Sequence, residues 1–156
     1  MEHLALHILI IHKIFIYFNM TKELSKKDKQ LILNDLCPRL PYRPKAAILH
    51  GIFEPETVTV IGYSGRFVDT ISSQYELERV RLYLRPMSSM TDEERDKFRE
   101  LGGVMSHNVE NDTWAIAAFS PEAYKFLNSH FFDYNNLIPA GLAWEGNEDM
   151  YTITML

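Results

Sequence analysis

The chain has 156 residues, of which 46% are apolar and 24% are charged. That length predicts one domain, and that composition, typical of globular proteins, excludes a disordered chain. The single cysteine, Cys37, excludes an internal disulfide framework and a cysteine-based zinc site, and it fits a reducing, cytoplasmic setting.

Charge is unevenly distributed along the chain. The net charge of −5 argues against a nucleic-acid partner, because phosphate contacts need clustered lysine and arginine. Residues 20–45 carry seven basic and three acidic side chains, whereas residues 46–156 carry eight basic and seventeen acidic ones. The second part is therefore either a solvated acidic face or a surface that meets a basic protein partner.

The first nineteen residues form a separate stretch. Positions 4–18 are mostly apolar but are fewer than the roughly 20 residues that a membrane span needs, so no membrane association is expected. The flanks of this run do not fit a signal peptide. Since Met20-Thr21-Lys22-Glu23 resembles the start of a cytosolic protein, we expect residues 1–19 to be a non-native or poorly packed extension. Residues 20–156 are then a single α+β domain.

A helix is expected over residues 21–37. Ser25 and Asp28 resemble a capping box, and Cys37-Pro38 ends the helix because a residue before proline avoids helical angles. Cys37 is interpreted as a buried thiol at the helix end. Residues 39–44 carry two further prolines and are expected to form an extended loop.

A β-hairpin region follows. Residues 46–53 are a strand candidate, and residues 54–56 are expected to turn the chain. The strongest strand covers residues 57–63, which are rich in β-branched side chains. Ser64-Gly65 predicts a hairpin turn, after which residues 66–71 return as the next strand.

Residues 73–94 hold two capping-box signals. The first, over residues 73–76, predicts a short helix over residues 74–81, although residues 80–84 alternate in the manner of a strand. The second pairs Thr91 with Glu94 just after a proline corner and predicts a surface helix that ends at Leu101.

The C-terminal third predicts two strands and a helix. Residues 104–107 are a short strand, and residues 113–119 are a strand that we expect to be central, because both of its faces are apolar. Ser120-Pro121-Glu122 predicts a helix start, and residues 132–138 predict a turn with a short helix. Residues 142–144 are an apolar segment that we expect to dock at an unspecified place.

These elements together predict an α+β fold. We expect a small, mainly antiparallel sheet of three to five strands, covered by three or four helices.

Three motifs taken together resemble a group of small uncharacterised proteins that gut Bacteroides-type bacteria and their phages or prophages encode. The motifs are residues 35–42, residues 83–91, and residues 132–134 with 137–138 and 141–143. The resemblance covers about residues 20–151 and implies a cytosolic, mobile-element setting without a known activity. Asn135-Asn136 stands where the group has a basic residue and a glycine.

An enzymatic site would have to use the scattered histidines. His107 with Asp112 is the best acid–base pair, since the two residues flank one loop, and His130 with Asp133 is the next. No spacing of ligand residues predicts a metal site, and no glycine-rich loop predicts a phosphate-bearing cofactor, so neither metal nor cofactor is expected.

Arg85 allows two interpretations at the proline corner. In a structural role, it bonds a carboxylate or helix-end carbonyls while Ser88 and Ser89 hold the turn. In a functional role, the arginine and the two hydroxyl groups bind an anion or the carboxylate of a partner.

The leading functional prediction is a non-enzymatic protein-binding module of a phage or mobile element, with the acidic second part as its partner surface. One alternative is a small hydrolase or ligand-binding enzyme that uses His107 and Asp112. A second alternative is a phage inhibitor of a host defence system that imitates nucleic-acid charge.

Overall fold

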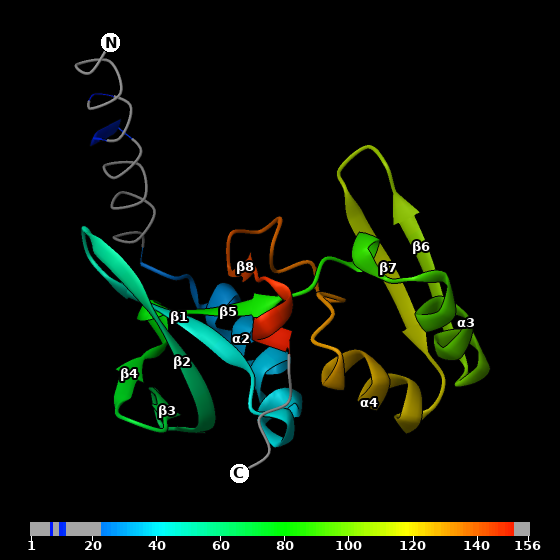
Figure 1. The fold of residues 1–156 in the computed structure, drawn as a ribbon, viewed down its shortest axis with the longest axis horizontal. Coiled ribbons are helices and arrows are strands. Elements are labelled where there is room, and N and C mark those ends of the chain that lie inside the picture. Colours follow the sequence, from blue (N-terminus) through cyan, green and yellow to red (C-terminus); the bar gives the residue numbers. More distant parts are fainter. Residues whose placement is uncertain (1–6, 8–9, 12–22, 152–156) are drawn as a thin grey trace.

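The computed structural model describes residues 7, 10–11 and 23–151 (Figure 1). The expectation for residues 1–19 therefore lies almost entirely outside the described residues. The described chain has two hydrophobic cores. We call residues 23–85 with 135–151 the sheet lobe and residues 86–134 the hairpin lobe.

The first helix of the sheet lobe, α2 (Lys26–Leu36), begins at the expected capping box. Ser25 Oγ accepts from the backbone N–H of Asp28 at 3.0 Å, and the Asp28 carboxylate accepts from Ser25 N. The extended loop expected next is wrong, because Cys37–Tyr42 forms a 3-10 helix. Cys37 is exposed, so its assignment as a buried thiol is also wrong.

One sheet of six strands dominates the sheet lobe (Figure 1). Its strands in spatial order are β4 (Gln74–Glu76), β3 (Phe67–Thr70), β2 (Phe53–Ser64), β1 (Lys45–His50), β5 (Val80–Leu84) and β8 (Ala143–Glu145). Only the β5–β8 pair is parallel among these neighbours, which confirms a mainly antiparallel α+β fold. The expected three to five strands were too few, because the three-residue strands β4 and β8 are too short to show a periodic pattern.

Two local predictions in this sheet are wrong. The turn expected over residues 54–56 is wrong, because the chain turns at Gly51, whose φ of +68° suits glycine. Pro55 lies inside β2 instead, near a register shift where a ladder hydrogen bond is not needed. Residues 74–81 are not a helix: β4 is followed by the 3-10 helix Leu77–Arg79 and by β5. Tyr75 pairs with β3, so tertiary strand pairing overrides the capping-box pattern.

The hairpin lobe holds two helices against a two-stranded sheet. Its elements are the 3-10 helix Met87–Ser89, α3 (Asp92–Glu100), β6 (Gly103–Asn108), β7 (Thr113–Ala118) and α4 (Pro121–Ser129). Phe98 of α3 is fully buried, and a Cβ at Gly103 would lie only 2.2 Å from its ring. The prediction that β7 is a central strand is wrong, because β7 pairs only with β6 in a sheet of two strands.

Both helices of the hairpin lobe begin where their caps predict. Thr91 and Glu94 form a complete capping box at α3, and Ser120 Oγ accepts from Ala123 N at 3.1 Å at the start of α4. Residues 132–138 turn without the expected short helix. Across the described ranges, no helix has both the length and the apolar character required to cross a bilayer.

Candidate functional site

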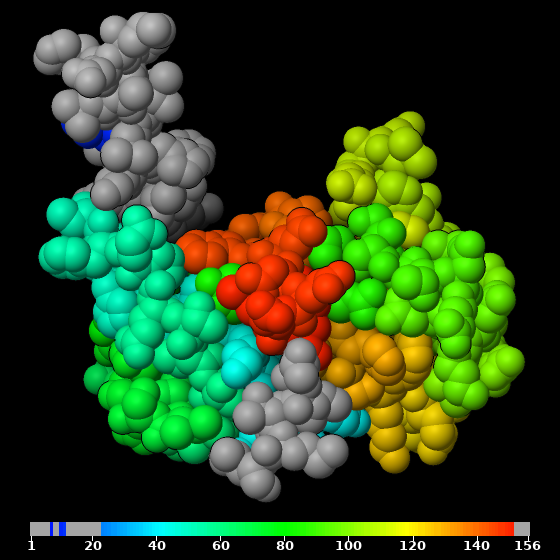
Figure 2. Space-filling model, viewed as in Figure 1, coloured from blue at the N-terminus to red at the C-terminus, as the bar shows by residue number. Residues whose placement is uncertain are grey.

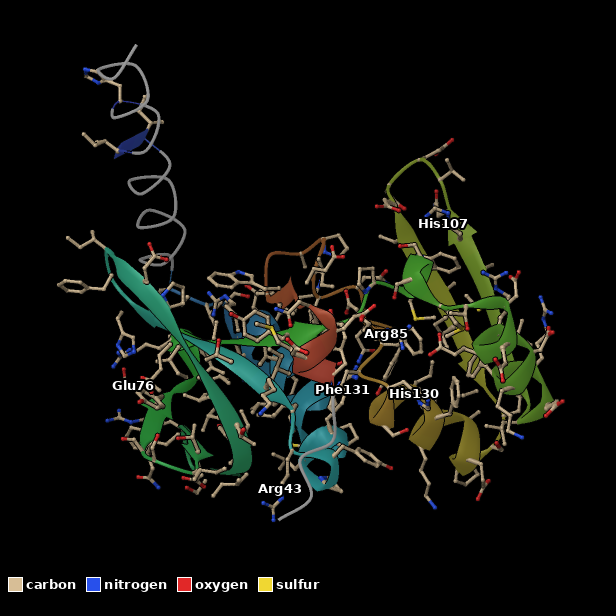
Figure 3. The ribbon with its side chains drawn as sticks, in the orientation of Figure 1. Arg43, Glu76, Arg85, His107, His130 and Phe131 are labelled. Atoms are coloured by element: carbon tan, nitrogen blue, oxygen red, sulfur yellow. The ribbon has the colours of Figure 1, made fainter. Side chains whose placement is uncertain are left out.

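The two lobes are joined by two chain segments that run side by side. Arg85 N donates to Phe131 O, and Asp133 N donates to Arg85 O, each at 2.8 Å. These bonds form a parallel bridge between Arg85 and Phe132. The end of β5 and the segment after α4 therefore form one connection, and Figure 3 places Arg85 at this junction.

The side chain of Arg85 makes three hydrogen bonds and two aromatic contacts within the protein. Its two terminal nitrogens donate to both carboxylate oxygens of Glu94, at 2.8 and 3.0 Å, and one also donates to Ser89 O at 3.2 Å. The guanidinium lies 4.2 Å from the ring centroid of Phe132 and 6.0 Å from that of Tyr151. This geometry agrees with the structural interpretation of Arg85, since the guanidinium is paired with Glu94 of the same corner.

Glu94 is the carboxylate that holds this corner together. Burial opposes ionisation of its side chain, but hydrogen bonds from Arg85 and from the backbone of Thr91 outweigh burial and lower the pKa of Glu94 below its usual 4.5. Ser89 Oγ donates to Pro86 O at 2.8 Å, so this hydroxyl also serves the turn. Both Ser88 and Ser89 are exposed.

A buried ion pair fastens the hairpin lobe to the start of the chain. Arg39 donates to both carboxylate oxygens of Asp35 at 2.8 Å, and both side chains are fully buried. Arg39 also donates to Phe132 O at 2.7 Å and lies 5.1 Å from the ring centroid of Tyr134. Asn135 adds a donor to Asp35 at 2.9 Å. The junction is therefore held by a network of hydrogen bonds and a buried ion pair.

A pocket of about 260 Å³ opens between the lobes directly beside this network. Its walls come from the proline corner, the β6–β7 hairpin, the loop after α4 and β8; they are Pro86, Met87, Ser88, Asp112, Trp114, Asp133, Asn136, Ile138, Pro139 and Glu145. Figure 2 shows the surface hollowed between the hairpin and the segment that follows α4. We call this pocket the cleft.

Three carboxyl groups and no basic side chain line the cleft. Asp112 and Glu145 are exposed, whereas Asp133 is only 4% exposed. Burial raises the pKa of Asp133, and the N–H groups of Ile138 and Leu137, each 2.8 Å from a carboxylate oxygen, offset only part of this effect. The two exposed carboxylates, Asp112 and Glu145, therefore offer acceptor oxygens and negative charge to a ligand.

The hairpin side of the cleft carries an aromatic and acidic group of residues. His107 Nε2 lies 2.8 Å from Asp112 Oδ1, and the imidazole stacks on Trp114 with ring centroids 4.5 Å apart. The structure thus brings His107 and Asp112 together, as their sequence spacing suggests. Among residues 23–151, Asp112 is the one hydrogen-bond partner of His107, and no nucleophilic side chain completes a catalytic triad there.

The other acid–base pair is not brought together. The ring of His130 packs against those of Phe126 and Phe132, and its Nδ1 is 2.8 Å from Phe126 O. Asp133 is used by backbone N–H groups instead. Figure 3 shows His130 near the junction and His107 far out on the hairpin. His130 therefore serves the core of the hairpin lobe.

The cleft is suited to a positively charged organic group. Carboxylates with an aromatic face are the usual partners of lysine and arginine side chains. Within the described part of the chain, no group of three or more histidine, cysteine or acidic side chains could hold a metal ion. Sequence reasoning did not assign Trp114, Asn136 or Glu145 to a site. The acidity of the second part of the chain was a signal for Glu145 alone.

Comparison of the chain with protein-family models, with curated proteins and with solved structures gave no match. The geometry of the cleft is therefore the basis for a functional proposal.

Proposed function

We propose that the protein is a non-enzymatic protein-binding module whose cleft receives a basic side chain of its partner. The observation that carries the proposal is a concave site whose lining includes Asp112, Asp133 and Glu145 and no lysine, arginine or histidine. A carboxylate-lined pocket attracts cations from a distance and rejects acidic partners. The resemblance to phage and prophage proteins favours a protein of the bacterial host as this partner.

Trp114 supports this proposal from the hairpin side. Its indole is partly buried, is stacked by His107 on one side and lines the cleft. An arginine or lysine that enters the cleft would contact this aromatic wall while its charge faces the carboxylates. An arginine anchored between an aromatic ring and carboxylates is the kind of contact that dominates the binding energy of an interface.

A small cationic probe tests the cleft directly. In an NMR titration, N-acetyl-arginine amide should shift the indole N–H of Trp114 with a Kd on the order of 1 mM, whereas the neutral analogue N-acetyl-citrulline amide should not. The double substitution Asp112→Asn with Glu145→Gln should abolish the shift. Asp112 has a φ of +51°, a conformation that asparagine tolerates, so this change keeps the hairpin loop.

A matched control removes the same charge elsewhere. Asp92→Asn with Glu93→Gln alters two exposed acids in the first turn of α3, outside the cleft. This control should bind the probe as the wild-type protein does. Equal weakening in both double variants would show that only net charge matters, and the proposal would fail. Capture from a host lysate with the same two variants then identifies the partner.

One observation favours an enzyme as a second candidate: the 2.8 Å contact that orients His107 through Asp112. The test is hydrolysis of a panel of chromogenic esters and phosphate esters. A catalytic pair predicts activity that Asp112→Asn reduces by roughly a hundredfold. If the wild-type protein has no activity but binds the probe, the enzyme candidate fails and the binding module stands.

A further inference from the structure

His107 is not part of the cleft lining, but it contacts two residues that are. Its Nε2 lies 2.8 Å from Asp112 Oδ1. Its imidazole stacks on Trp114, with ring centroids 4.5 Å apart and an angle of 19° between the ring planes. Asp112 and Trp114 both line the cleft. A change in the charge of His107 therefore reaches a ligand through these two side chains.

These two contacts are of the same kind as those proposed for the basic side chain of a partner. A cation in the cleft would face a carboxylate and the ring of Trp114. Protonated His107 is itself a cation that already makes both contacts, because its charge pairs with Asp112 and its ring lies on the indole. It is then an internal competitor of the ligand. Neutral His107, in contrast, leaves the negative charge of Asp112 uncompensated.

The other titratable groups around the cleft are acids. Within the described part of the chain, His107 is the one basic side chain in ionic contact with Asp112. Glu145 and Asp133 are the remaining carboxyl groups of the lining, and Glu110 is exposed in the same hairpin loop as Asp112. Histidine is the side chain that ordinarily changes its charge between about pH 8 and pH 5. His107 is therefore the group that can switch the charge of this wall near neutral pH.

We propose that His107 is a positioning residue that makes the binding of a cation in the cleft depend on pH. This inference rests on the proposed function and names how the same site is regulated. While His107 is neutral, Asp112 and Glu145 both present uncompensated charge to the ligand. Once His107 is protonated, Asp112 is paired internally, and of these two exposed carboxylates only Glu145 stays uncompensated. Binding of a basic side chain therefore weakens as the pH falls.

The NMR titration of the full chain with N-acetyl-arginine amide, carried out at about pH 8 and at about pH 5.5, tests this regulation. The Kd of the wild-type protein should be about fivefold higher at the lower pH, which is the effect of one unit charge about 4 Å away in water. His107→Gln, which is neutral throughout, should give the same Kd at both pH values. His107→Lys, which stays charged throughout, should bind weakly at both.

The linkage must also act in reverse, which gives a second readout on the unmodified protein. Because the ligand binds better while His107 is neutral, a bound ligand opposes its protonation. At a pH where the Cε1–H resonance of His107 lies between its acid and alkaline positions, N-acetyl-arginine amide should move it towards the alkaline position. The neutral N-acetyl-citrulline amide should leave it in place.

His50→Gln is the matched control. His50 also faces a carboxylate and an aromatic ring, since its Nε2 lies 3.3 Å from Glu56 Oε2 and its ring centroid lies 6.2 Å from that of Tyr75. These residues belong to the sheet lobe and lie outside the cleft lining. His50→Gln should therefore keep the dependence of the wild-type Kd on pH.

Two results would overturn the regulation while the proposed function stands. One is a wild-type Kd that is the same at both pH values, and the other is a pH dependence that His107→Gln retains. A wild-type protein that does not bind the probe even at the higher pH is a different result. It overturns the proposed function, and this inference with it.

Discussion

The side-chain amide of Asn136 pairs with the backbone of Trp114 as a neighbouring strand would. Trp114 N donates to Asn136 Oδ1 at 2.7 Å, and Asn136 Nδ2 donates to Trp114 O at 2.9 Å. The two residues belong to different lobes and both line the cleft. This clamp satisfies an edge of β7 and fixes the distance across the cleft.

Asn136→Gly should loosen this edge. Asn136 has a φ of +56°, which glycine adopts freely, so the change removes the two hydrogen bonds without adding backbone strain. We expect a loss of about 1–3 kcal/mol in the free energy of unfolding, from urea denaturation. Hydrogen exchange of the Trp114 amide should become faster while that of Ala117, on the β6 side, is retained. Unchanged exchange at Trp114 would show that the clamp does not hold the strand.

Arg39→Met should destabilise the protein strongly. It leaves the carboxylate of Asp35 fully buried with Asn135 as its remaining side-chain donor, and breaking a buried pair in this way costs about 3–5 kcal/mol. Adding Asp35→Leu should recover part of the loss, because no buried charge remains. Arg66→Met is the control, since that side chain is 77% exposed and should cost almost nothing. A loss below about 1 kcal/mol for Arg39→Met would contradict this role.

Glu94→Gln should flatten the fall in stability at acid pH. The pKa of Glu94 is lowered in the folded protein, so its stabilising contribution is complete above the unfolded value near 4.5 and disappears as the pH falls through the lower folded value. Melting temperatures of the wild-type protein and of Glu94→Gln should therefore differ at neutral pH and converge in acid. Glu93→Gln, exposed in the same turn, should follow the wild-type curve. Parallel curves for Glu94→Gln would refute the linkage.

Gly103→Ala should disrupt the core of the hairpin lobe. A Cβ at this position would overlap the ring of Phe98, so the ring or the strand must move, at a cost of about 1–3 kcal/mol. Combining the change with Phe98→Leu should cost less than the sum of the two single changes, because the smaller side chain vacates the space. Additive losses in urea denaturation would show that the two positions do not compete for one volume.

The helices and the long strands follow from local signals. The capping boxes at Ser25 and Thr91 and the serine–proline start of α4 each depend on residues within one turn, so they appear in the sequence. The misjudged parts depend on distant partners instead. Gln74–Glu76 is a strand because β3 lies beside it, and the 3-10 helix after α2 is accompanied by the buried pair between Arg39 and Asp35.

The cleft was harder to foresee than the fold. His107 and Asp112 could be paired from the sequence, because a hairpin loop brings neighbours in the chain together. Asp112, Asp133 and Glu145 come from three separate segments, and only the docking of the lobes gathers them. Arg85 could be placed at a corner, but its partner Glu94 was visible only as a member of the capping box.

The hairpin lobe is one uninterrupted stretch of the chain, and its entry and exit are hydrogen-bonded neighbours at Arg85 and Phe132. The two strands that flank it in sequence, β5 and β8, already pair with each other inside the sheet lobe. The lobe is therefore a continuous insert between two strands that pair with each other. A different segment inserted between Arg85 and Phe132 would replace Asp112 and Trp114 in the lining of the cleft, while the six-stranded sheet would stay unchanged.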